Sequence, residues 1–353
     1  MLDKGISISA AQIDNILAES AENLVPEYHD IGKAGVTTSN YISTDDTGSR
    51  HQGKNGFTNT LCNDFFTFFK TTDSKSRANF LEILGMQKDK SYTISNDAFA
   101  YAQKYGLSAG SYKWLISQAC TTYTNQEFEK LLAVRLLSAK DKRVIIESCL
   151  YATSLANGLP KDLIILSDGA QQFNILTHAL CWIHAERAIK KLVPVDDQEA
   201  LQIKTILDLL WKYYDALRKY RLNPTQEQKD YLLKRFDEIF ATPTNSSSLA
   251  PILKGFCDKK AELLLVLEYP EVPLQNNGAE RSIRPFVTTR KISGGTRSDL
   301  GRTARDVFAT IFQTCRKNRI SVYAYLQDRI KNMGKISNLG QTIRLKNANP
   351  ASP

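Results

Sequence analysis

The chain has 353 residues, 42% of them hydrophobic and 9% aromatic, which is the composition of a globular protein with two or three domains, or with one domain that carries large insertions. No apolar run approaches the roughly 20 residues of a membrane span, and the first 12 residues lack a signal-peptide core. The six cysteines lie far apart, which excludes a disulfide framework. We therefore expect a cytoplasmic protein without a membrane partner.

The net charge of +9 is concentrated at the C-terminal end. Residues 276–353 hold 15 basic and four acidic residues, a net charge of +11, so the rest of the chain has a net charge of −2. This uneven distribution is typical of a protein with a polyanionic partner. A basic face that contacts only solvent is the alternative, and charge alone does not decide between the two.

The N-terminal part predicts a helix over residues 6–28, with Ser9 as its N-cap. A shorter helix is expected over residues 75–85, where Gly85 ends it. Residues 86–160 are mostly helical in pattern.

Between these two helices, residues 39–70 are typical of strands. The first strand leads to Asp45 and Asp46, and the pair Asn55-Gly56 predicts a hairpin turn.

The middle of the chain predicts a buried strand that ends at Asp168, within residues 162–169. Residues 170–180 are expected to be helical, residues 181–184 to form a further short strand, and residues 185–193 to be helical again.

Residues 196–269 predict a long helical segment, in which Asn223-Pro224 begins the second helix. A helix with one apolar face is expected over residues 298–318, and Ser321 caps the last one. The tail from residue 336 is polar, and we expect it to be poorly ordered. This order of elements predicts an α/β fold, a mixed sheet interrupted by helical insertions.

Three acidic positions stand out against this order. Asp45 and Asp168 come at the carboxyl ends of predicted strands, where functional groups collect in open α/β sheets, and Glu280 follows at the start of a helix. Three carboxylates from separate elements suit Mg²⁺, which prefers oxygen ligands.

Each position also has a purely structural interpretation. Asp45-Asp46 and Asp168-Gly169 are both typical of turns, and Asn277 followed three residues later by Glu280 is a capping box. From spacing alone, the capping box is the stronger interpretation of Glu280.

Other chemistries find less support. The chain has no GxxxxGK[ST], GxGxxG or GxSxG motif. Cys181-x-x-His184, with His178 nearby, is half of a zinc site, and no second pair completes it.

Four blocks, in order along the chain, resemble the signature blocks of the insertion-sequence-66 transposases. They read YISTDDTGSRHQGKNG, LSDGAQQFN, CWIHAERAIKKL and NNGAERSIRP, the last continuing through TRKISGGTRSDLGRTA to YAYL. The resemblance runs from about residue 5 to residue 332. It implies a DDE transposase of a mobile element, with a ribonuclease-H-like catalytic core.

The same resemblance implies a ligand set for Mg²⁺, with Mn²⁺ as a substitute. Its members are Asp45, Asp168 and Glu280, and Asp46 remains an alternative first ligand. It implies Mg²⁺-dependent strand cleavage and strand transfer at the ends of the insertion sequence. Two alternatives are a truncated, non-mobilising DNA-binding remnant and a metal-dependent nuclease without strand transfer.

DNA, as transposon ends and as target, is the expected partner, with the chain forming a homo-oligomer on it and associating with the bacterial nucleoid when bound. The candidates for phosphate contacts are Arg187, Arg281, Arg284, Arg290 and Lys291. Pairing of these cations with surface acids is the alternative. His184 is an accessory candidate near the metals, or a residue that closes a helix start.

Family members usually carry a longer N-terminal DNA-binding region, and this chain begins near its end. We divide the sequence into a helical remnant of that region (1–38), a first half of the core (39–85), a helical insertion (86–160), a second part of the core (161–194), a second helical insertion (195–272), a basic helical part with the catalytic glutamate (273–335) and a polar tail (336–353).

Overall fold

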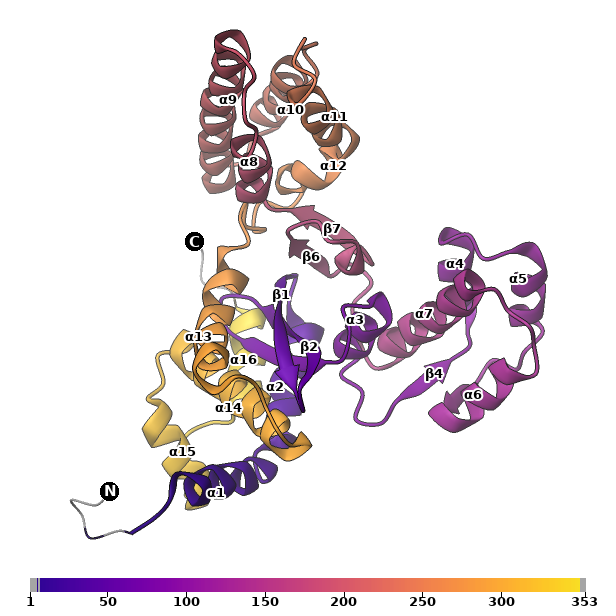
Figure 1. The fold of residues 1–353 in the computed structure, drawn as a ribbon, viewed down its shortest axis with the longest axis vertical. Coiled ribbons are helices and arrows are strands. Elements are labelled where there is room, and N and C mark those ends of the chain that lie inside the picture. Colours follow the sequence, from indigo (N-terminus) through magenta and orange to yellow (C-terminus); the bar gives the residue numbers. More distant parts are fainter. Residues whose placement is uncertain (1–4, 6, 350–353) are drawn as a thin grey trace. The chain divides into compact units, whose positions relative to one another are not determined.

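The computed structural model describes residue 5 and residues 7–349 (Figure 1). Predictions that fall on residues 1–4, 6 and 350–353 lie outside the described part. The chain forms two compact units. Of the described residues, the first unit comprises residues 5, 7–39, Asp46–Leu163 and 282–349, and the second is built from Asn40–Asp45 and Ile164–Arg281. No helix in the described residues is long and apolar enough to cross a membrane.

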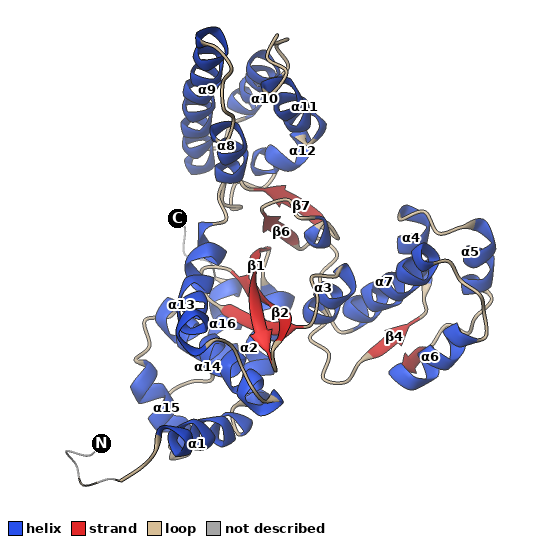
Figure 2. Cartoon of the chain, viewed as in Figure 1, coloured by secondary structure: helices blue, strands red, loops and turns tan. Residues whose placement is uncertain are grey.

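Five strands form a mixed sheet in the order β3-β2-β1-β6-β7, which confirms the predicted α/β class (Figure 2). Their bounds are β1 Tyr41–His51, β2 Lys54–Cys62, β3 Thr67–Thr72, β6 Ile164–Ser167 and β7 Thr177–Leu180. β2 and β3 pair antiparallel, whereas β6 pairs parallel with both β1 and β7.

The hairpin turn between β1 and β2 differs from the prediction. Gln52 and Gly53 make it, with φ of 49° and 75°, whereas Asn55 and Gly56 lie inside β2. β1 therefore runs on to His51, and Asp45 lies within the strand instead of at its end. Asn55-Gly56 and Gly53 are both typical of turns. The strands pair so that the turn falls at Gly53.

Helices make up the rest of the first unit, with one small ribbon. Their bounds are α1 Ala10–Glu22, α2 Val25–Thr38, α3 Arg77–Leu84, α4 Asn96–Lys104, α5 Ala109–Ile116, α6 Asn125–Ala133, α7 Ala139–Ala156, α14 Asp299–Lys317, α15 Val322–Ile330 and α16 Leu339–Ala348. The ribbon joins β4 Ser91–Thr93 to β5 Thr122–Thr124 within the stretch predicted as mostly helical. Ser9 and Ser321 cap α1 and α15, and Gly85 ends α3, as predicted. The predicted first helix is divided in two: α1 ends at Glu22 and α2 begins at Val25, with Pro26 in its first turn.

The expectation of a poorly ordered tail is wrong for residues 339–348. They form α16, whose Leu339 and Ile343 have no exposed surface. The helix packs against α2, where Arg344 forms an ion pair with Asp30 and the Asn347 side chain donates to the Thr38 hydroxyl at 2.8 Å. Two apolar residues four apart were too weak a signal of a buried helix face.

α14 protects the edge strand β3. Side chains at every fourth position of the helix accept hydrogen bonds from alternate backbone N–H groups of the strand. The pairs are Thr67 N–H to Thr314 at 3.2 Å, Phe69 N–H to Thr310 at 3.0 Å and Thr71 N–H to Asp306 at 2.7 Å. One helical turn of α14 thus spans two residues of β3. The helix covers a strand edge that could otherwise pair with another chain.

Asp306 in this row is fully enclosed, and burial raises its pKa to about 6. The unfolded value lies near 3.9, so ionisation costs the folded state about 3 kcal/mol. The stability gained from the protonated form is fully present below the unfolded pKa and is lost as the pH rises through 6. We expect Asp306→Asn to gain about 3 kcal/mol relative to wild type between pH 3.5 and pH 7 in urea unfolding. Parallel pH curves for the two proteins would contradict this.

The second unit places β6 and β7 beside a helical cluster. The helices are α8 Trp182–Lys190, α9 Asp197–Leu222, α10 Gln226–Phe240, α11 Leu249–Asp258 and α12 Lys260–Leu263, with short 3₁₀ turns at Gln171–Phe173 (η2) and Leu265–Leu267 (η3). Two predictions are wrong here: residues 177–180 are a strand and not a helix, and residues 182–184 begin a helix and are not a strand. A short apolar run on a buried strand cannot be told from a buried helix by its pattern.

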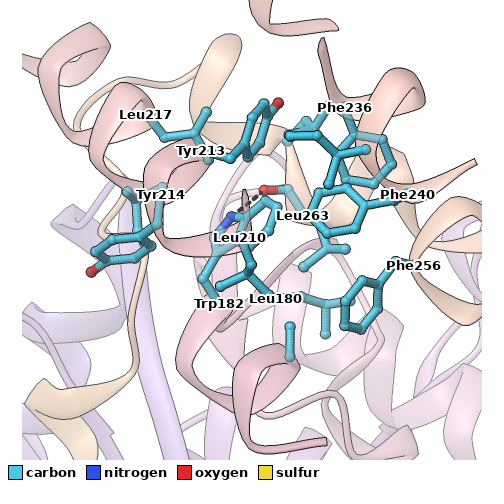
Figure 3. Packing of buried hydrophobic residues seen from close by; sticks show 14 of the residues in the cluster. Leu180, Trp182, Leu210, Tyr213, Tyr214, Leu217, Phe236, Phe240, Phe256 and Leu263 are labelled. Atoms are coloured by element: carbon cyan, nitrogen blue, oxygen red, sulfur yellow. Dashed lines mark hydrogen bonds between the residues drawn. The ribbon is translucent and has the colours of Figure 1, made fainter. Parts of the chain in front are cut away.

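Trp182 anchors the cluster (Figure 3). It is 1% exposed, its rings contact Tyr213 and Phe240, and its Nε1–H donates to the Leu263 carbonyl at 2.9 Å. Asp196 caps α9, and α10 begins after Thr225, two residues later than expected. The first residues of α8 are therefore held rigidly against this core.

Candidate active site

The pairing of β1 with β6 brings two of the predicted carboxylates together. The parallel register joins Ile42 to Ile165 and Ser43 to Leu166. Continued by two residues, this register brings Asp45 opposite Asp168, the first residue after β6. Both acids belong to the second unit, where Asp45 is half-buried and Asp168 exposed.

The turn after β6 fixes where Asp168 points. The Ser167 hydroxyl accepts the Gly169 N–H at 3.1 Å, and the Asp168 carboxylate accepts the Ala170 N–H at 3.0 Å. Gly169 has φ +94°, and a Cβ there would approach Leu180 to 2.9 Å, so only glycine fits. The strand-ending turn that was weighed as an alternative is present, and it presents Asp168 to solvent.

Asn276 ties the third acid to the same edge of the sheet. This buried residue donates its side-chain N–H to the Thr44 carbonyl at 2.7 Å and its backbone N–H to the Cys181 sulfur at 3.2 Å. The Glu280 N–H in turn donates to the Asn276 carbonyl at 3.2 Å. The start of α13 (Asn277–Ser293) is thus fastened next to Asp45 and to the start of α8.

The predicted capping box is wrong in its register. Asn277 is the first residue of α13, and its side-chain N–H donates to Gln275 at 2.9 Å. The helix also continues past Pro285 to Ser293. Asn276, and not Asn277, holds the start of the helix.

The Glu280 carboxylate is held by Arg187 of α8. The two Arg187 terminal nitrogens lie 3.0 Å and 3.3 Å from the two carboxylate oxygens. His184 Nε2 lies 3.8 Å from one of these oxygens and 3.4 Å from Arg187. The hydrogen bond to Glu280 raises the pKa of Arg187. Arg187, predicted as a DNA contact, therefore pairs with an acid of the candidate site.

The other predicted cations keep clear of Glu280. Arg281 donates to the backbone carbonyl of Asn277, and Arg290 donates to the Thr47 hydroxyl at 3.2 Å. Arg284 and Lys291 are exposed and have no ion pair with any described carboxylate. Within the described residues, the alternative of pairing with an acid thus holds for Arg187 and not for Arg284 or Lys291.

Asp46 lies in the first unit and pairs with Lys75. Successive side chains of a strand point to opposite faces, so Asp46 and Asp45 point to opposite sides of β1. This arrangement favours Asp45 over Asp46 as the partner of Asp168.

The donor set suits a hard cation in part. Among the described residues, no three His, Cys, Asp or Glu side chains lie close enough together to hold a metal ion. The neighbouring pair Asp45 and Asp168 fits Mg²⁺, which is typically held by one or two carboxylates plus water and phosphate. Both oxygens of Glu280, the third predicted ligand, accept hydrogen bonds from Arg187.

Comparisons with known proteins identify the family of the chain. Residues 150–304 match the profile of a family described as Transposase IS66 family. The chain is 37% identical over 302 residues to the uncharacterized protein y4jO of Sinorhizobium fredii, covering 84% of this chain and 94% of that protein. No solved structure matches the chain. The chain belongs to the IS66 family of transposases.

Proposed function

We propose that the chain cleaves DNA strands at the ends of an insertion sequence and joins them to target DNA. The observation that carries this proposal is the parallel register of β1 and β6, which, continued by two residues, brings Asp45 of β1 opposite Asp168 at the carboxyl end of β6. Functional groups of open α/β sheets collect at this edge. The hydrogen bond from Asn276 to Thr44, next to Asp45, supports Glu280 as a third member, because Glu280 follows Asn276 by one helical turn.

Asp45 and Asp168 would hold Mg²⁺, with Glu280 as a further ligand. When bound, Mg²⁺ supplies charge neutralisation and activates the attacking oxygen in a phosphoryl transfer. Water is the first nucleophile, and the freed 3′-hydroxyl of the DNA is the second. The chain's own residues position the scissile phosphate and need no covalent intermediate with DNA.

A second candidate is DNA binding without cleavage, favoured by the pairing of Glu280 with Arg187. A third, strand cleavage without joining, is separated by supplying precleaved ends. We expect precleaved ends to be joined to a target plasmid in the presence of Mg²⁺. Cleavage of intact ends without any joining of precleaved ones would reduce the function to that of a nuclease.

The exposed arginines of α13 are proposed to contact DNA phosphates. We expect the combined variant Arg281→Ala and Arg284→Ala to lower the slope of log affinity against log salt by about 1.8, because each phosphate contact contributes about 0.9. Fluorescence anisotropy with labelled duplex DNA measures the slope. The matched control is Lys212→Ala with Lys219→Ala, two exposed cations of α9. An equal slope in both double variants would show that Arg281 and Arg284 do not contact DNA phosphates.

A further inference from the structure

Behind the Asp168 turn, a buried hydrogen bond joins Ser167 to His178, with Glu262 close by, and the proposed mechanism uses none of the three. The Ser167 hydroxyl lies 2.8 Å from His178 Nε2, and His178 Nδ1 lies 3.6 Å from a carboxylate oxygen of Glu262. Ser167 ends β6, His178 lies in β7 and Glu262 in α12. All three belong to the second unit.

The protons on these groups can be assigned. Ser167 already accepts the Gly169 N–H, and its own buried hydroxyl proton needs an acceptor, which His178 Nε2 provides. The imidazole proton then lies on Nδ1, which has no hydrogen-bond partner among the described residues and lies 3.6 Å from a carboxylate oxygen of Glu262. The hydrogen bond between Ser167 and His178 is therefore the contact that orients the Ser167 hydroxyl.

Serine, histidine and glutamate in this order resemble a catalytic triad. The burial of Ser167 excludes a role for it as a nucleophile. Ser167 has no exposed surface, so its oxygen cannot reach a substrate carbonyl or phosphate. The same oxygen is already committed to Gly169 and His178. Ser167 and His178 act instead on the adjacent turn. Ser167 precedes Asp168, and the Ser167 hydroxyl fixes Gly169 by accepting its N–H.

We propose that His178 is a positioning residue, which fixes the Asp168 carboxylate for cation binding by locking Ser167. This inference rests on the proposed function, in which Asp168 holds the metal. Without an acceptor at position 178, the Ser167 hydroxyl turns away and the Gly169 N–H loses its partner. The turn that presents Asp168 then has several conformations in place of one.

The test compares His178→Gln with His178→Leu in the full chain. The glutamine Oε1 restores an acceptor at about the reach of Nε2, whereas leucine fills the space without one. Binding of Mn²⁺ alone is measured by calorimetry, with Asp168→Asn as the reference. We expect a loss of roughly tenfold in Mn²⁺ affinity for the leucine variant, the scale of lost outer-shell partners, and a value close to wild type for glutamine.

The outcomes separate the two claims. Wild-type Mn²⁺ affinity in Asp168→Asn would overturn the role of Asp168 and with it the proposed function. Lost affinity in Asp168→Asn but wild-type affinity in His178→Leu would overturn only the positioning role. Equal losses in the glutamine and leucine variants would also overturn it, because a merely structural histidine is not rescued by an acceptor.

A spectroscopic signature tests the proton assignment independently. The chain has four histidines, so the ¹⁵N signals of the His178 ring can be assigned by single substitution. We expect the proton on Nδ1 in the wild type. A proton on Nε2 would contradict the donation from Ser167.

Discussion

Asp168→Asn is expected to abolish strand cleavage and strand joining, with a loss of at least about a thousandfold. Asp168 follows the last residue of β6, and in the proposed function its carboxylate contributes several kcal/mol of charge stabilisation in the transition state. The asparagine amide still accepts the Ala170 N–H, so the turn is kept. Cleavage of end-labelled DNA on a denaturing gel measures the loss.

The matched control for this variant is Asp162→Asn. Asp162 is also exposed and lies just before β6, near the opposite end of the same strand. It is expected to cleave at the wild-type rate. A fully active Asp168→Asn protein, with Asp162→Asn unchanged, would remove Asp168 from the reaction.

Glu280→Gln is expected to lose activity by at least about a hundredfold, while the free energy of unfolding changes by less than about 1 kcal/mol. The pair with Arg187 is partly exposed, with side chains 45% and 23% accessible, so its contribution to stability is small. The loss of activity has another cause: glutamine keeps the shape and removes the negative charge that a cation needs. Cleavage assays and urea unfolding measure the two effects.

Glu271→Gln is the control for this change, because Glu271 is an exposed acid in the segment that leads to α13. It should affect neither property. If Glu280→Gln unfolds more easily and yet cleaves normally, Glu280 is only a structural partner of Arg187.

The strands that carry the first two acids were predictable for a physical reason. Residues 163–166 are uniformly apolar because β6 is buried on both faces, and the following Asp168-Gly169 marks its end. Asp45 was assigned to the correct strand but to the wrong place in it. The length of β1 depends on its antiparallel neighbour, and that pairing is a property of the folded sheet.

The element that fastens Glu280 was not predictable in the same way. Asn276 acts through a hydrogen bond to Thr44, which lies 232 positions earlier in the chain. A local pattern contains no sign of such a bond, and the neighbouring Asn277 offered a plausible cap that the structure does not use. Likewise, the pairing of Arg187 with Glu280 joins two helices that are 93 positions apart. The pair Asn276-Asn277 was the one local indication of how this helix begins.

Metal-dependent cleavage at the ends of the insertion sequence is tested most directly with DNA taken from both sides of the reading frame. A plasmid carrying it is incubated with the full chain and Mg²⁺, with the Asp45→Asn protein and with chelator as controls, and the ends of all broken strands are sequenced. We expect strand breaks at two fixed positions, each leaving a 3′-hydroxyl. These breaks should be absent with chelator and with the Asp45→Asn protein. Breaks that persist in the chelator or in the Asp45→Asn protein, or no breaks at all, would contradict it.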